Sequence, residues 1–77
     1  MIQSYRDKNP RVHETAFIAE NATVVGDVVI GPDASVWFGS VIRADVHFIR
    51  IGARTNIQDL TVMHVNHGRN PTILDED

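Results

Sequence analysis

The segment VIRADVHFIRIGARTNIQDLTVMHV, residues 41–65, holds most of the side chains in this sequence that are suited to chemistry. Because the chain has no cysteine, thiolate nucleophiles, disulfides and thiolate zinc sites are excluded, so imidazole and carboxylate groups would have to hold any metal ion. A histidine could instead serve as a general base. The candidate residues in this segment and just beyond it are Arg43, Asp45, Asn56, Gln58, Asp59, His64 and His67.

The composition narrows the possible partners. The chain has 77 residues, which is enough for one small domain with a thin core. Its net charge is −3 and its seven Lys and Arg residues are scattered, so a nucleic-acid partner is not expected. No apolar run approaches the length of a membrane span, and the opening MIQSYRDKNP lacks the apolar stretch of a signal peptide. We expect a soluble, cytoplasmic protein without membrane contact.

A period of six residues runs through the middle of the chain. Aliphatic residues mark it at Ile18, Val24, Ile30, Val36 and Ile42, and again, after one break, at Ile51, Ile57 and Met63. Four residues after the first five stand small or β-branched residues: Ala22, Val28, Ala34, Ser40 and Val46. Three residues after the same five stand types that tolerate tight turns: Asn21, Asp27, Asp33, Gly39 and Asp45.

This period predicts a three-sided parallel β-helix. Short strands put the small residue and the next aliphatic inward, a turn follows, and three strands close a coil of 18 residues. Ile18 should then lie over Val36 and Val24 over Ile42, while an antiparallel sandwich of short strands is the alternative. The nine-residue gap between Ile42 and Ile51 predicts an outward bulge of three extra residues within HFIRI, with either Phe48 or Ile51 pointing inward.

The same spacing brings distant polar residues together. With the three extra residues included, Ile57 stacks under Val36 and Met63 under Ile42. Arg43 directly follows Ile42, and His64 directly follows Met63. They should therefore share one corner in consecutive coils.

The pattern resembles the hexapeptide-repeat family, whose coils are left-handed, and this resemblance covers roughly residues 10–65. A narrower resemblance rests on RAD at 43–45, NIQD at 56–59 and MHV at 63–65, which look like the gamma-class carbonic anhydrases. It implies reversible hydration of carbon dioxide to bicarbonate in a homotrimer. The metal, zinc with iron or cobalt as alternatives, would lie between two subunits and be held by three histidines.

The resemblance also implies a role for each matched residue. His64 matches the first metal ligand, and Gln58 matches the side chain that orients the metal-bound solvent, with Asn56 assisting. Arg43 and Asp59 match residues that pair across the subunit boundary. Asp45 matches a structural residue near the site, and His67 is a candidate for carrying the proton away, since imidazole titrates near neutral pH.

Two departures from the family pattern stand out. The second and third histidines should come from a later coil, but this sequence ends at Asp77, before any capping helix. We therefore expect a single partial β-helix domain: an N-terminal cap in 1–16, hexapeptide coils in 17–65, and a loop with the start of a further coil in 66–77. As 77 residues alone it should be inactive. Val46 also stands where some active relatives carry a glutamate that helps proton transfer.

Other interpretations remain open. Many hexapeptide-repeat proteins transfer acyl groups from coenzyme A with a histidine as general base, and His64 could serve there. A trimeric scaffold without a complete site is the third possibility. Asp45 and Asp59 could simply belong to turns, and Arg43 to the solvated surface. Trp37 and Phe38 are expected at an interface between subunits.

Overall fold

The computed structural model describes the backbone of residues 1–64 and 72–74, and the side chains of residues 1–44 and 48–63. Nine strands occur there: β1 (Ile2–Gln3), β2 (Arg11–Val12), β3 (Phe17–Ile18), β4 (Thr23–Ile30), β5 (Ser35–Val36), β6 (Val41–Ile51), β7 (Asn56–Ile57), β8 (Val62–His64) and β9 (Thr72–Leu74). Every pairing between these strands is parallel. Within residues 1–64 and 72–74, no helical segment qualifies as a candidate membrane span.

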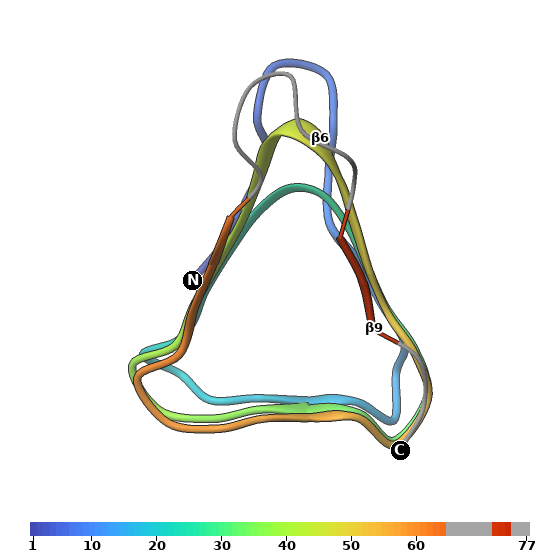
Figure 1. The fold of residues 1–77 in the computed structure, drawn as a ribbon, viewed down its shortest axis with the longest axis vertical. Helices are drawn as coiled ribbons and strands as arrows, with labels where there is room; N and C mark the ends of the chain where they lie inside the picture. The colour runs from blue at the N-terminus through green and yellow to red at the C-terminus, as the bar shows by residue number, and fades with distance from the viewer. Residues whose placement is uncertain (65–71, 75–77) are drawn as a thin grey trace.

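The strands form a three-sided prism (Figure 1). The first side, at the left, contains β1, β8 and the opening halves of β4 and β6, and the second side contains their closing halves with β2 and β9. The third side, at the bottom, contains β3, β5 and β7. The chain runs clockwise in this view while it advances toward the viewer, which makes the coil left-handed. The expected left-handed parallel β-helix is confirmed.

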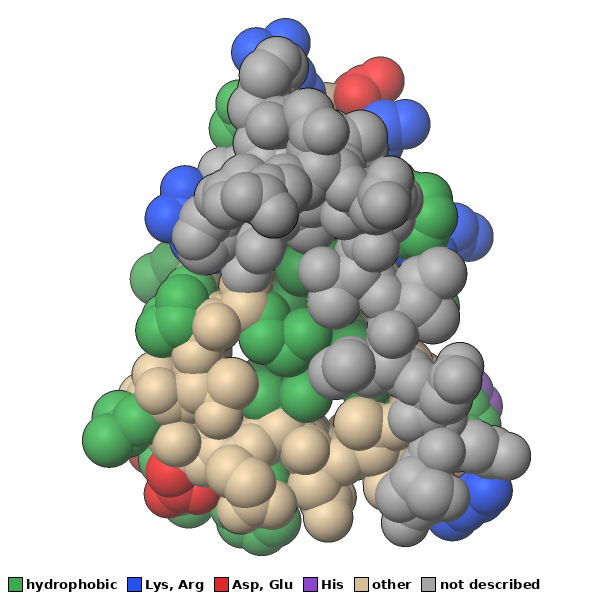
Figure 2. Space-filling model, in the orientation of Figure 1, with side chains coloured by type: hydrophobic (Ala, Val, Ile, Leu, Met, Phe, Trp, Pro, Cys, Tyr) green, Lys and Arg blue, Asp and Glu red, His purple; other side chains and the backbone are tan. Residues whose placement is uncertain are grey.

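Inward aliphatic residues fill the prism, and Figure 2 shows hydrophobic side chains in the middle of the triangle. Along β4 the side chains alternate between buried and half-buried, as a strand with one face on a core requires. Ile18 pairs with Val36 and Val36 with Ile57, which confirms the predicted stacking. The buried apolar residues are Ala19, Ala22, Val24, Val28, Ile30, Ala34, Val36, Ile42, Ala44, Ile49, Ile51 and Ile57.

Of the five predicted turn residues, Asn21, Asp33 and Gly39 lie in turns, whereas Asp27 and Asp45 lie within the continuous strands β4 and β6. Asp33 and Gly39 adopt φ values of 60° and 74°, as a tight turn requires. Asp27, in contrast, lies within the continuous strand β4, and the backbone bends one residue earlier, at Gly26 with φ 87°. An added Cβ on Gly26 would lie 2.3 Å from the carbonyl oxygen of Ala44 in the next coil. Glycine is therefore needed there for both conformation and space.

The break in the period is a bulge in β6, slightly earlier than predicted. Gly26 pairs with Ala44 and Val28 with Ile49, so three extra residues lie between Ala44 and Ile49 instead of within residues 47–51. The reason is alternation, because Ile49 and Ile51 are both buried and must both point inward. Ile51 fills the position that Phe48 could have taken. Ile49, not Val46, pairs with Val28.

Candidate functional site

The side chain of Arg50 anchors the bulge to the preceding coil. Its Nη1 donates hydrogen bonds to the backbone oxygens of Asp27, at 3.1 Å, and Ile49, at 3.0 Å. Its Nη2 lies 3.2 Å from Asp27 Oδ1, and its guanidinium carbon lies 4.3 Å from the ring centroid of Phe48. The bulge contains Asp45, so these contacts fix the backbone segment that carries this predicted site residue.

Removing this anchor should weaken the fold measurably. We expect Arg50→Ala to lower the free energy of unfolding by about 1 to 2 kcal/mol, mainly through the two hydrogen bonds to carbonyl groups. The ion pair itself is about one-third exposed and should contribute no more than about 1 kcal/mol. Urea unfolding of Arg50→Ala and of Asp27→Asn separates the contribution of the hydrogen bonds from that of the ion pair. Asp27→Asn loses the ion pair but keeps the carbonyl acceptors. An equal loss in both variants would contradict the assignment to the carbonyls.

Arg43 and His64 share a rung of the first side. β6 and β8 pair with Arg43 opposite His64, across 21 residues of sequence, which confirms the predicted rung. The rung lies within strands on the first side, and not at a corner as the spacing had suggested. Arg43 stands between the buried residues Ile42 and Ala44 and is exposed on the outer face. The side chain of His64 lies outside the described residues, as do that of Asp45 and the whole of His67.

Asn56 and Gln58 lie on a different side of the prism. They flank Ile57, which is buried on the third side, so both amides are outward and exposed. Asp59 follows, also exposed, in the turn that leads from the third side to the first. Within one chain, the candidate residues are therefore divided between two faces that meet at this corner (Figure 1).

The side chain of Asn56 is held by a hydrogen-bond chain that the sequence did not reveal. Trp37 Nε1 donates to Ser35 Oγ at 2.9 Å, and Ser35 Oγ donates to Asn56 Oδ1. The ring of Phe17 packs on Trp37 with a centroid separation of 4.9 Å. With its oxygen engaged, Asn56 can offer its amide hydrogens outward. The signal available in the sequence was the predicted stacking of Val36 on Ile57, which places the preceding residues, Ser35 and Asn56, side by side, as the structure shows.

Large apolar side chains are exposed around the same corner. Val62 is 64% and Leu60 79% exposed, and three aromatic residues on the third side and at the corner are also solvent-accessible. Figure 2 shows hydrophobic groups at the lower left and along the lower edge. These aromatic residues are Phe17, Trp37 and Phe38. Clustered exposed apolar groups of this kind mark contact surfaces.

The described part of the chain does not form a metal site by itself. Among those residues, no three His, Cys, Asp or Glu side chains gather closely enough to hold an ion. A catalytic zinc site needs three protein ligands and one open position. Any such site must therefore draw on donors beyond the described side chains.

Comparison with known proteins gives a consistent family relationship. Residues 9–44 match the family model described as bacterial transferase hexapeptide (six repeats). The chain is 54% identical over 77 residues to an uncharacterized transferase, YtoA, of Bacillus subtilis, and 46% identical over 76 residues to a carbonic anhydrase of Geobacillus kaustophilus. These matches take in 100% and 99% of this chain.

A solved structure agrees with the sequence comparison. A hexapeptide transferase family protein from Anaplasma phagocytophilum superposes with a TM-score of 0.92 at 45% identity, covering 99% of this chain and 43% of that one. This chain spans 44% and 41% of the lengths of the two curated relatives named above.

Proposed function

Since the chain is a hexapeptide-repeat protein similar to gamma-class carbonic anhydrases, we propose that it supplies part of an active site that reversibly hydrates carbon dioxide. The observation that carries the proposal is the division of the matched residues between two faces. Arg43 and His64 lie on one rung of the first side, and Asn56 and Gln58 on the third. Such a division suits a site completed between neighbouring subunits.

A three-fold assembly would complete three such sites. If the third side of one copy contacts the first side of the next, each copy presents both halves, and a head-to-tail contact of this type closes into a ring. The exposed apolar residues around the corner, including Leu60 and Val62, would then be covered. Asp59 of one copy would pair with Arg43 of another. A homotrimer is therefore part of the proposal.

A bound metal ion would lower the pKa of a coordinated water molecule to about 7. In the proposal His64 contributes one neutral imidazole to the ion, with zinc first and iron or cobalt as alternatives. Gln58 hydrogen-bonds the reacting solvent with a neutral amide, which adds no negative charge. Asn56, oriented through Ser35, assists with its amide hydrogens. His67 is proposed to carry the released proton.

Only one of the three implied histidine ligands falls within these 77 residues. We therefore expect the 77-residue chain on its own to be inactive, and activity to require two further histidines. The decisive first observation is the reading frame after Asp77. Two histidines within about fifty residues would complete a three-imidazole site, and their absence would contradict hydration by this protein.

Metal analysis of the full translation product tests the role of His64. We expect about one zinc, iron or cobalt ion per subunit, and His64→Ala should lose most of the metal while the trimer stays folded and assembled. The matched control is His13→Ala, since His13 is exposed and contacts Thr15 in the first coil. Metal retained by His64→Ala, or lost equally from His13→Ala, would contradict the ligand role.

A coenzyme A-dependent acyltransferase is the second candidate, favoured by the transferase names of the relatives from Bacillus subtilis and Anaplasma phagocytophilum. His64 would then act as a general base. Absent metal together with saturable coenzyme A binding would support this activity. Absence of both would support a catalytically silent trimeric scaffold.

A further inference from the structure

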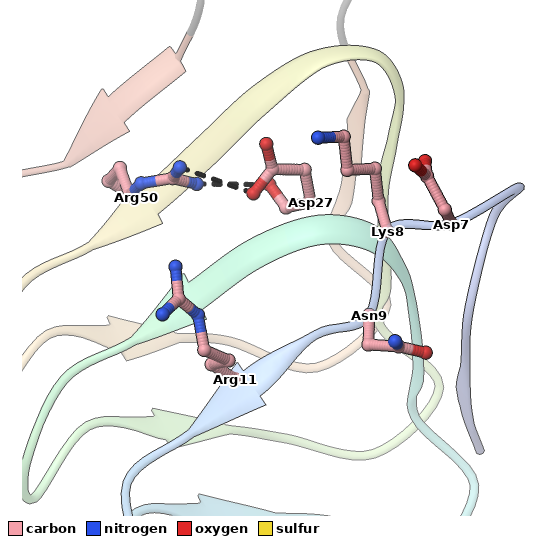
Figure 3. Close-up of a pocket in the computed structure, with 6 residues that line it drawn as sticks. All are labelled: Asp7, Lys8, Asn9, Arg11, Asp27 and Arg50. Carbon is pink, nitrogen blue, oxygen red and sulfur yellow. Dashed lines mark hydrogen bonds and ion pairs between the residues drawn. The ribbon is translucent and has the colours of Figure 1, made fainter.

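A second polar site lies away from the two faces discussed above. A pocket of about 470 Å³ opens where the N-terminal loop passes the corner between the first and second sides (Figure 3). Its lining comes from that loop with β2, from β4 and from β6, and so from three successive passes of the chain. The lining residues are Asp7, Lys8, Asn9, Arg11, Asp27 and Arg50.

Three of these side chains are cationic and two are anionic, and one cation and one anion form an ion pair with each other. Asp27 is bound by Arg50 at 3.2 Å, as the dashed lines in Figure 3 mark. Lys8 and Arg11 are exposed, and neither side chain has an ion pair or hydrogen bond with the part of the chain that the structure describes. In Figure 3 their charged ends lie on opposite sides of the Asp27 carboxylate, and Asp7 lies beyond Lys8.

This arrangement disfavours a metal ion and favours an anion. Asp27 is already committed to Arg50. Among the described lining residues, this leaves one carboxylate without an ion pair, Asp7, against two such cations, Lys8 and Arg11. A divalent cation needs several oxygen donors and would be repelled here. Guanidinium offers parallel N–H donors that match two oxygens of a phosphate group, and an ammonium adds a point charge. The local excess of positive charge occurs in a chain whose net charge is −3.

The size of the pocket indicates more than a bare ion. A volume of about 470 Å³ lies within the roughly 300–1,000 Å³ typical of small-molecule sites. We infer that this pocket binds the phosphate group of a small phosphorylated molecule through Arg11 and Lys8, with the Arg50–Asp27 pair as a fixed wall. Asn9 can donate a further hydrogen bond from its amide. The inference does not depend on the proposed carbon dioxide chemistry.

Calorimetric titration of the full chain with glycerol phosphate, and separately with inorganic phosphate, tests this inference at low ionic strength. We expect saturable binding of glycerol phosphate that weakens as salt is added. Arg11→Gln should weaken it at least about tenfold, and Lys8→Gln should weaken it as well, because each loses a charge-assisted contact. Asp7→Asn should strengthen it by removing the opposing charge.

The control with the same change of charge is Arg54→Gln, because Arg54 lies in the turn between the second and third sides, outside the lining. The Arg54→Gln variant should bind glycerol phosphate with an affinity within about twofold of the parent protein, because a distant charge is screened. Circular dichroism of each variant separates loss of binding from loss of fold. No saturable binding, tighter binding of inorganic phosphate than of the ester, or equal weakening by Arg54→Gln would overturn the inference.

Discussion

Replacing Val36 with aspartate is expected to abolish the folded state. Val36 is 0% exposed and pairs with Ile18 in one neighbouring coil and Ile57 in the other, so the new carboxylate would be enclosed by aliphatic side chains. An unpaired buried charge costs well over about 4 kcal/mol, which consumes most of the roughly 5 to 15 kcal/mol that stabilises a domain. Far-UV circular dichroism at 25 °C and during thermal melting measures the loss.

The matched control is the same substitution on an outward position. Val62 belongs to β8 on the first side and is 64% exposed, so Val62→Asp should retain the β-sheet signal, whatever it does to contacts between subunits. Glu20, which is also exposed, should tolerate replacement by glutamine. If Val36→Asp and Val62→Asp melted alike, the assignment of inward and outward positions would be wrong.

Among the glycines that the structure describes, Gly26 should be the most damaging to replace with alanine. The backbone at Gly26 has φ 87°, a region that costs L-residues about 1 to 2 kcal/mol, and the added Cβ would meet the Ala44 carbonyl oxygen at 2.3 Å. That oxygen belongs to the ladder between β4 and β6 and cannot move without separating the coils. We expect a total loss of at least about 3 kcal/mol in urea unfolding, since strain at such positions adds to the steric cost.

Gly39→Ala measures the conformational part of that loss, so the difference between the two variants gives the steric part. Gly39 has a similar φ of 74°, but its added Cβ would meet Cδ2 of Leu60, the end of a flexible side chain that is 79% exposed. Leu60 can rotate away, so this variant should lose only the conformational cost of about 1 to 2 kcal/mol. Equal losses in both variants would mean that the close approach of Gly26 to Ala44 is not what limits the corner.

Periodicity predicted most of the coil because each inward position repeats a simple physical demand. Ile18, Val36 and Ile57 stack as expected, since a narrow prism accepts aliphatic side chains at its centre and little else. The corners were harder to predict. Aspartate suits a turn, yet Asp27 continues a strand, because Gly26 beside it can bend the backbone and accept the close approach of the next coil.

For the candidate site, residue spacing and strand alternation were enough to predict which residues stand on one rung and which side chains face outward. Arg43 and His64 follow from counting residues, because strand alternation and coil length are regular. Three features became visible only in the folded chain: Asn56 and Gln58 lie on another face, Ser35 holds Asn56, and Arg50 anchors the bulge to Asp27. These contacts join residues 21 and 23 positions apart, and side-chain geometry across coils selects them, not the residue types alone.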